Sequence, residues 1–278
     1  MSLYLKSAAF TPIESITFSS SGSLRSAFAH VSEILFEQST RVLEAISPDI
    51  RKEIGRHFLC STMIELPFTT GAIAESDLNV VGKEQHVPVT SFVNTYECAS
   101  WGYSLRYYLK QNPDARYVMV SILDANVLDL SFWQSNENWG NSGFGLCTLL
   151  LEVESFEKHD ITASCAVTYN TTPEFATIIR KMAAGRDDLT LSLPFFPENI
   201  RQIFTKLLNG FKQLPDLHDR WGHCFGSDPW LNIICHGVNG DFHQPKKILA
   251  CSIALNGYYC TAEVCVDQQS TFYLSEAV

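Results

Sequence analysis

The sequence predicts an α/β protein, because short apolar strands alternate along it with amphipathic helices. Runs such as Arg116–Leu123 and Leu146–Val153 have the length of strands, and an almost wholly apolar run is typical of a strand buried on both faces. Leu24–Ile46 and Glu198–Leu214 carry apolar residues at helical spacing. With 278 residues, 46% of them hydrophobic, the chain can bury a large core.

The first half is predicted to contain five strands and two long helices. A proline stops each helix, since Pro48 follows Leu24–Ile46 and Pro113 follows Ala99–Lys110. The stretch Asp124–Gly145 is polar and aromatic without periodicity, and such a length usually carries function or binds a partner. The predicted strands are Leu3–Phe10, Phe58–Met63, Val89–Thr95, Arg116–Leu123 and Leu146–Val153.

The second half repeats this alternation more loosely. Its end is predicted to be a hairpin of Ile248–Leu255 and Tyr258–Val266, because Asn256-Gly257 is typical of a type I′ turn. The sequence therefore predicts two α/β halves, residues 1–155 and 156–278. The other predicted elements are the strands Ile161–Tyr169, Leu189–Leu193 and Trp230–Cys235 and the helices Pro173–Ala184 and Glu198–Leu214.

The charge of the chain narrows the classes of partner. Its net charge is −10, which repels the phosphates of nucleic acids and the headgroups of anionic membranes. No apolar run is long enough to cross a membrane, and Met1–Pro12 lacks the features of a signal peptide. The nine cysteines are odd in number and scattered, as in proteins that keep reduced thiols. We therefore expect a cytoplasmic protein that binds neither nucleic acid nor membrane.

Cys98 is the first candidate for catalysis. It stands where the predicted strand Val89–Thr95 ends and the helix Ala99–Lys110 begins. The free N–H groups at a helix N-terminus favour thiolate over thiol and can hold the oxyanion of a thioester under attack. This position predicts a nucleophile with a lowered pKa, which alkylating reagents would label first. A small buried residue at a tight junction would show the same pattern.

His236 is the second candidate. The predicted buried strand Trp230–Cys235 leads into the turn 236–240, whose glycines would let the backbone approach a ligand. A histidine after a strand can also be a satisfied structural residue. Together, however, a positioned cysteine and a positioned histidine are the minimum set for covalent acyl transfer. We therefore expect the His236 ring within hydrogen-bonding reach of the Cys98 sulfur.

Two other kinds of site are alternative interpretations of these residues. A papain-like protease has its cysteine before its histidine, but not in this strand-and-turn context. A zinc site would draw on a histidine- and cysteine-rich region that lacks Cys-x-x-Cys and His-x-x-x-His spacing, so no metal is expected. The members of that region are His218, His223, Cys224, Cys235, His236 and His243.

Several segments, in order, resemble ketoacyl-ACP synthase III of the thiolase superfamily. Ser91–Leu105 (SFVNTYECASWGYSL) resembles the family's nucleophile segment, and Ala115–Asn126 the strand after it. Gly140–Val153 resembles the family's glycine-rich turn and strand. WLNIICHGVNG is similar to the strand before the family's His-Gln-Ala-Asn motif, and ILACSIALNGYYCTAEVCV to its last hairpin. The resemblance implies two similar α/β halves in a layered α-β-α-β-α arrangement, usually dimeric.

Residue by residue, the resemblance implies Cys98 as the acylated nucleophile and His236 as the acid/base. It implies Asn239 as a supporting residue, and an oxyanion hole formed by the Cys98 N–H with the Asn256-Gly257 turn. Glu97 departs from the family's small residue at that position and would raise the Cys98 pKa if buried beside the thiol. We expect the family's Gly-Asn-Thr-Ser-type loop to be absent, because only seven residues separate His236-Gly237-Val238-Asn239-Gly240 from the hairpin.

The resemblance thus implies acyl transfer or Claisen-type condensation through an acyl-cysteine thioester. The donor would be a CoA or carrier-protein thioester, with no permanently bound cofactor, in fatty-acid-like or polyketide secondary metabolism. The alternative is a non-catalytic partner subunit of a heterodimeric ketosynthase. We expect a homodimer or heterodimer, with Arg116–Leu123 at the subunit interface. Asp124–Gly140 would line the acyl pocket or the dimer contact.

Overall fold

The computed structural model describes residues 2–13, 24–64, 71, 73–79, 87–155 and 161–275. Strands and helices alternate along it, as the sequence predicts. The first half comprises β1 (Ser2–Pro12), α1 (Leu24–Leu43), α2 (Pro48–Arg51), β2 (Ile54–Cys60), the 3-10 helix η1 (Glu75–Leu78), β3 (Ser91–Val93), the 3-10 helix η2 (Glu97–Ala99), α4 (Ser100–Gln111), β4 (Tyr117–Asp124), α5 (Ser131–Gln134), β5 (Ser135–Asn136), β6 (Gly140–Asn141) and β7 (Gly145–Ser155).

The second half is shorter. It comprises β8 (Ile161–Cys165), α6 (Thr171–Ala183), β9 (Leu189–Ser192), α7 (Glu198–Leu207), α8 (His218–Trp221), the 3-10 helix η3 (Phe225–Ser227), α9 (Asp228–Val238), β10 (Lys246–Ile253), β11 (Tyr258–Val266) and β12 (Thr271–Leu274). The predicted boundary after residue 155 falls at the end of β7, next to residues 156–160, which lie outside the described residues. That boundary stays a prediction.

Strand pairing repeats between the two halves. The first half has the order β3-β2-β4-β7-β1, in which β2 is parallel to β3 and β4, and β7 is antiparallel to β4 and β1. The second half has the order β9-β10-β11-β8, with β9 parallel to β10, and β11 antiparallel to β10 and β8. The counterpart of β3 is reduced to one bridge between Leu191 and Gln213. The second half is therefore a copy of the first with a shortened edge.

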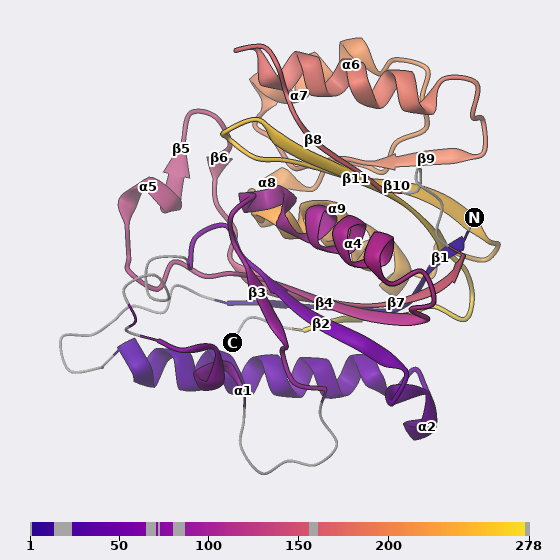
Figure 1. Ribbon diagram of the computed structural model, residues 1–278. Coiled ribbons are helices and arrows are strands. Elements are labelled where there is room, and N and C mark those ends of the chain that lie inside the picture. Colours follow the sequence, from indigo (N-terminus) through magenta and orange to yellow (C-terminus); the bar gives the residue numbers. More distant parts are fainter. Residues whose placement is uncertain are drawn as a thin grey trace.

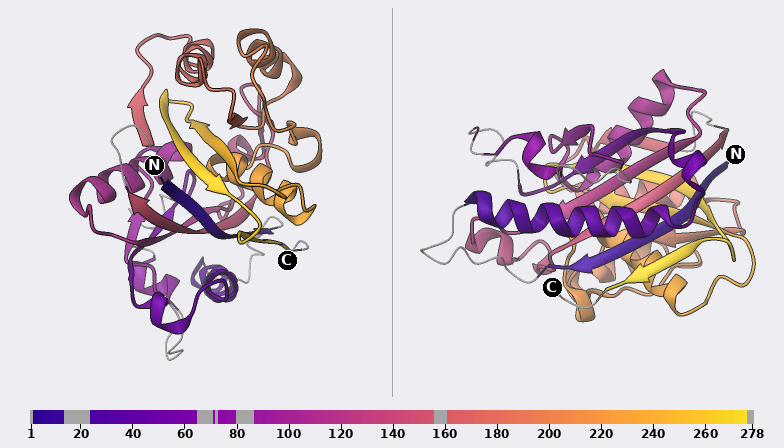
Figure 2. Two further views of the ribbon diagram at one scale, coloured as in Figure 1. Left: turned by 90° about the vertical axis from the view of Figure 1, so that its right-hand side faces the viewer. Right: turned by 90° about the horizontal axis from the view of Figure 1, so that it is seen from below.

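The elements stack in five layers (Figure 1). α1 lies across the outer face of β1 and β7 (Figure 2), and α6 and α7 cover the outer face of the second-half sheet. β1 also pairs in parallel with β11, so the strands of the two halves form one continuous ten-stranded sheet in the described part of the chain. α4 and α9 lie between its two halves, where Trp101 and Trp230 pack edge to face with ring centroids 4.9 Å apart. Both indoles are fully buried, so the largest hydrophobic cluster lies in this middle layer.

The predicted strand Trp230–Cys235 is helical, and this prediction was wrong. Asp228 and Pro229 begin α9 with residues favoured in a first helical turn. Every residue from Asp228 to Cys235 is buried, because the helix contacts both sheets. A helix that is apolar all round has no amphipathic periodicity, and a short apolar run then reads equally well as a strand.

The strand predicted to lie at a subunit interface, Arg116–Leu123, lies inside the sheet. Arg116–Leu123 forms most of β4, which is hydrogen-bonded on one side to β2 and on the other to β7. A strand paired on both sides has no free edge to offer to another subunit. Among the described residues, β3 ends this side of the sheet. The prediction that Arg116–Leu123 extends a partner's sheet was therefore wrong.

The final hairpin is confirmed, with a different turn. β10 and β11 pair antiparallel from Lys246↔Val266 to Ile253↔Tyr259. Gly257 alone in the turn has a positive φ, 87°, whereas a type I′ turn needs two such residues. The Gly257 N–H donates to the Ala254 carbonyl and the Ala254 N–H to the Tyr258 carbonyl. This is a three-residue loop whose glycine takes the left-handed position.

Gly102 of α4 tests the packing of the middle layer. A Cβ atom added there would lie 2.3 Å from the Cβ of Cys260 on β11. We expect Gly102→Ala to lower the free energy of unfolding by about 1–3 kcal/mol, because overpacking forces the helix and strand apart. Urea denaturation measures this. Tyr107→Ala, at a side chain 72% exposed on the same helix, is the control and should change stability by less than about 0.5 kcal/mol. Equal effects of the two substitutions would contradict this packing.

Candidate active site

The heads of the two central helices meet in the middle of the molecule. η2 leads into α4 and η3 leads into α9, and the two 3-10 turns contact each other. Each turn begins with a non-glycine residue in the left-handed region, Glu97 with φ 47° and Phe225 with φ 52°. A Cβ at Gly226 would lie 3.1 Å from the Cys98 carbonyl oxygen, so glycine permits this close approach. Left-handed non-glycine residues are strained and concentrate at functional sites.

A cavity of about 330 Å³ opens at this meeting point. Cys98, Glu97 and Thr62 line it from the first half, and His223 lines it from the second. The region that the sequence marked as a long aromatic stretch supplies part of the wall. The aromatic lining residues are Phe132, Trp133, Trp139, Phe196 and Phe225, and the others are Asn138, Thr171, Thr172, Ile200, Ile253, Ala254 and Leu255.

Cys98 is positioned as predicted, at the start of a helix, but its electrostatics differ from the prediction. Burial raises the pKa of the Cys98 thiol well above its usual range, and the carboxylates of Asp124 and Glu97 raise it further. The Thr62 hydroxyl, 3.6 Å from the sulfur, acts in the opposite direction. The expected low-pKa thiolate was therefore wrong, because desolvation and nearby carboxylates outweigh the helix N-terminus. The thiol needs a base before it can attack.

His223 is the histidine that lines the same cavity as Cys98. Its Nδ1 lies 2.6 Å from Oδ2 of Asp228 and 2.9 Å from the Phe195 carbonyl oxygen. No described residue forms a hydrogen bond with its Nε2. Burial is the largest single influence and lowers the pKa of His223, but the charge and hydrogen bond of Asp228, the Phe195 carbonyl and the Asp124 charge together outweigh it, and the net shift is upward. Cys98 and His223 thus line one cavity, and the imidazole of His223 is paired with the buried carboxylate of Asp228, as in covalent acyl-transfer sites where an acidic group orients the histidine.

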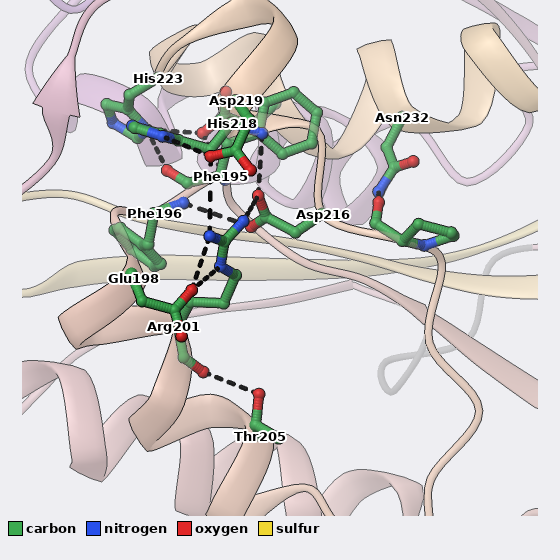
Figure 3. A network of polar contacts seen from close by, with 12 residues as sticks. Phe195, Phe196, Glu198, Arg201, Thr205, Asp216, His218, Asp219, His223 and Asn232 are labelled. Carbon is green, nitrogen blue, oxygen red and sulfur yellow. Dashed lines mark hydrogen bonds and ion pairs between the residues drawn. The ribbon is translucent and has the colours of Figure 1, made fainter.

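The loop after β9 is fixed in place around His223. Oδ2 of Asp228 accepts the Phe195 N–H at 2.9 Å, and Oδ2 of Asp216 accepts the Phe196 N–H at 3.4 Å. Arg201 joins Asp216 at 3.1 Å and also pairs with Glu198 and Asp219 (Figure 3). The Phe196 and His223 rings stack with centroids 5.8 Å apart. This network holds the wall of the cavity against the histidine.

His236 is not part of this site. It lies near the C-terminal end of α9, eight residues and so about 12 Å of helix from Asp228. Its Nδ1 lies 2.6 Å from Oδ2 of Asp241, and both side chains line a separate, open depression. The prediction of a Cys98–His236 dyad was wrong because a strand would have ended at His236, whereas the helix carries it away. The sequence signal for His223 is Gly222-His223 shortly before Asp228-Pro229, a helix start.

Of the other predicted site residues, Glu97 lines the cavity, whereas Asn239, Asn256 and Gly257 do not. Glu97 lines the cavity beside Cys98 and raises its pKa, as expected for a buried neighbour. Asn239 follows the last turn of α9 and is exposed. Asn256 is exposed too, and its Oδ1 accepts the Tyr258 N–H of its own turn. Asn256 and Gly257 do not line the cavity, because the tight turn directs Asn256 back onto itself; Ala254 and Leu255 lie there instead.

Asp124 is a fully buried carboxyl beneath both helix heads. Its Oδ1 accepts the Thr62 N–H at 2.6 Å and the Ser61 hydroxyl at 3.3 Å. Burial raises its pKa to about 6, although the N–H groups of Thr62 and Gly226 and the His223 ring oppose the shift. The Asp124 carboxyl, at the end of β4, therefore interacts electrostatically with the His223 ring and with the backbone of the turn that follows it.

The described residues form neither a metal site nor a membrane-spanning helix. Across the described ranges, no three His, Cys, Asp or Glu side chains are arranged to hold a metal ion. Of the helices in the described part of the chain, none is long and apolar enough to span a membrane. All nine cysteines are described, and each is a free thiol.

Comparisons with known proteins establish the fold. No family model matches the chain, and no curated protein matches its sequence. The structure is similar to that of ChlB3, an acyltransferase, with a TM-score of 0.67 and 12% identity over 95% of this chain and 97% of that one. OleA of Xanthomonas campestris, with cerulenin bound, is similar with a TM-score of 0.64 and 11% identity over 95% and 98% of the two chains. The 3-oxoacyl-(acyl carrier protein) synthase III of Pseudomonas aeruginosa gives 0.59 and 11% over 96% and 99%.

The fold is therefore that of the synthase III-like, thiolase-type enzymes, and the predicted layered α-β-α-β-α class is confirmed. Identity of 10–12% extends this likeness to the fold alone. The chain also covers nearly the full length of these structures, so its shortening is local. It falls on the edge strand of the second half rather than on the segment between His236 and β10, since the central helix of that half is present as α9.

Alkylation tests the state of Cys98. With a raised pKa and 5% exposure, Cys98 should react with iodoacetamide at pH 7 more slowly than the exposed Cys165. Its rate should increase as pH rises toward 9, because the thiolate fraction grows. Peptide mass spectrometry of a time course measures both, with Cys98→Ala identifying the peptide. Preferential labelling of Cys98 at pH 7 would mean that Cys98 is a thiolate at that pH and would contradict the raised pKa.

The pH dependence of stability tests Asp124. A folded-state pKa of about 6, above the ordinary 3.8, means that ionisation disfavours the fold. No cost arises below pH 3.8; it develops as pH rises to 6 and is constant above. Relative to Asp124→Asn, the wild type should lose about 3 kcal/mol of unfolding free energy between pH 3 and pH 7. Denaturation of both proteins across that interval gives the difference. A constant difference would mean that Asp124 titrates normally.

Proposed function

We propose that this protein is an acyltransferase that works through an acyl thioester on Cys98. The observation that carries the proposal is that Cys98 and His223, from the two halves of the chain, line the same cavity at the heads of the two central helices. A nucleophile and a base facing one space are the minimum machinery for acyl transfer. The fold shared with acyltransferase and synthase III structures supports this chemistry.

The first half-reaction loads Cys98. The His223 Nε2 takes the thiol proton while the sulfur attacks the thioester carbonyl of the donor. The carbon–sulfur bond of the donor then breaks, and the imidazolium returns the proton to the leaving thiolate. The Cys98 N–H, which forms no hydrogen bond with a described residue, is available to hold the oxyanion. The raised thiol pKa makes this proton transfer to His223 necessary.

The donor is an acyl-CoA or an acyl carrier protein, and no permanently bound cofactor is needed. A cavity of 150 Å³ suffices for benzene, so about 330 Å³ can hold an acyl group with room for the acceptor. The wall of Phe132, Trp133, Trp139 and Phe225 offers an apolar surface for that group. We assign the protein to fatty-acid-like or polyketide secondary metabolism in the cytoplasm, where its nine free thiols would stay reduced.

Association with a second subunit remains part of the proposal. Should the first-half sheet continue into another copy or a related chain, β3 is the strand whose edge is open among the described residues. The alternative function, a non-catalytic partner subunit, gains no support from the site. A subunit without catalysis has no need of a cysteine, a histidine and a buried aspartate ordered around one cavity.

Acylation of Cys98 tests the proposed function. Purified protein is incubated with acetyl-, hexanoyl- and benzoyl-CoA, and intact mass is measured over time. We expect the mass of one acyl group on the wild type and none on Cys98→Ala. His223→Ala should slow loading by roughly 10²-fold or more, because the thiol loses its base.

His236→Ala is the matched control, since that histidine also pairs with an aspartate at 2.6 Å but lies outside the cavity. It should load at the wild-type rate. Equal loading of the wild type and Cys98→Ala, or no loading from any CoA or carrier-protein thioester, would end the proposal.

A further inference from the structure

We propose that Asp228 is a positioning residue that holds His223 in its Nδ1–H tautomer, and that the site therefore transfers its acyl group to a hydroxyl or amine acceptor rather than to a carbon nucleophile made by decarboxylation. This inference rests on the proposed acyl-Cys98 intermediate and names the acceptor class of the same site.

Two independent contacts assign the tautomer. Nδ1 of His223 faces Oδ2 of Asp228 at 2.6 Å and the Phe195 carbonyl at 2.9 Å. A carboxylate and a carbonyl only accept hydrogen bonds, so Nδ1 must carry the proton. In neutral imidazole the other nitrogen, Nε2, then has a lone pair and no hydrogen. His223 thus faces the cavity as a proton acceptor.

Asp228 is held so that it cannot release the ring. It is fully buried, its Oδ1 accepts the Cys224 N–H at 2.6 Å, and its Oδ2 also accepts the Phe195 N–H at 2.9 Å. Both backbone donors belong to the segments that frame His223. The carboxylate is therefore aimed by the backbone before any substrate binds, and it stabilises the imidazolium that forms when Nε2 takes a proton.

This arrangement suits one kind of second half-reaction. The acceptor O–H or N–H gives its proton to Nε2 as its heteroatom attacks the Cys98 thioester. The new C–O or C–N bond forms, the C–S bond breaks, and the imidazolium passes the proton to the departing Cys98 sulfur. Decarboxylative condensation instead builds negative charge on an enolate oxygen, which needs hydrogen-bond donors. Neutral His223 offers none at Nε2, so the histidine that faces Cys98 across the cavity accepts a proton rather than stabilising an enolate oxygen; the other donor side chains of the lining are those of Thr62, Asn138, Thr171 and Thr172.

The tautomer can be measured in the unmodified protein. Nitrogen-15 chemical shifts of histidine-labelled wild type, with His223→Gln identifying the signal, should show a protonated Nδ1 and an unprotonated Nε2 at pH 8.5. His236 provides the internal comparison, because it pairs with Asp241 at the same distance outside the cavity. A neutral His223 with its hydrogen on Nε2 would overturn the proposal.

The acceptor class is tested on acetyl-Cys98 enzyme freed of excess acetyl-CoA. A small primary alcohol, a small primary amine and malonyl-CoA are each added at pH 8.5, and loss of the acetyl mass is followed. We expect acetyl ester and amide products, and less than a tenth of that rate from malonyl-CoA. Faster condensation with malonyl-CoA would refute the acceptor class while leaving acyl-Cys98 chemistry intact. Failure of acetylation itself would refute the proposed function as well.

Substitution separates positioning from structure. Asp228→Asn should slow transfer roughly 10²- to 10⁴-fold and move the acid limb of its pH–rate profile to lower pH, because the charge that raises the His223 pKa is gone. Asp241→Asn, the matched control, should change neither. Equal thermal stability and circular dichroism of the variants would show that folding is retained. An unshifted acid limb in folded Asp228→Asn would mean that Asp228 does not act through His223. If Asp228→Asn does not fold, the nitrogen-15 measurement decides.

Discussion

Burial of two helices between two sheets is the constraint on which the rest of this structure depends. α9 is buried from Asp228 to Cys235, α4 buries one face that includes Trp101 and Leu105, and the Trp101–Trp230 contact packs the two helices together. Only their heads reach the cavity, where strained turns at Glu97 and Phe225 direct the following residues toward each other. The hydrophobic core therefore determines where the candidate site lies: it fills the space around the helices, and the cavity opens at the helix heads, where Cys98 stands.

The same burial sets the electrostatics. Three ionisable groups, Asp124, His223 and Asp228, lie within this dry region, and each costs free energy unless it is paired or hydrogen-bonded. Burial raises the pKa of Asp124 and of Asp228, and it raises the pKa of Cys98, which the carboxylates of Asp124 and Asp228 raise further. In the proposed mechanism the thiol is therefore protonated at rest and His223 accepts its proton, unlike in sites that keep a standing thiolate.

The sequence was sufficient for the fold and for the position of Cys98 at a helix start, but it did not bring His223 to the cavity. Strands such as β4 and β7 are continuous apolar runs, and α1 has a clear apolar stripe, so pattern alone locates them. Cys98 stands at a strand-to-helix junction that local spacing reveals. α9 has no stripe, since both its faces are buried, and its misreading as a strand moved the histidine assignment by a whole helix. Whether Asn256 reaches the cavity depends on the turn geometry after Ala254, which the dipeptide Asn-Gly does not determine.

The reduction of one edge strand to the Leu191–Gln213 bridge has a consequence for assembly. In a protein built from two like halves, each half ends in an edge strand. Two edge strands with unpaired backbone groups would allow molecules to add to one another without limit, as in a fibre. Here the second-half end is a single bridge flanked by Lys212, whose Nζ is held by the Asp187 carbonyl. With that end blunted, β3 is the other terminus of the strand path β3 to β9 among the described residues, and pairing of two β3 edges would close at a dimer.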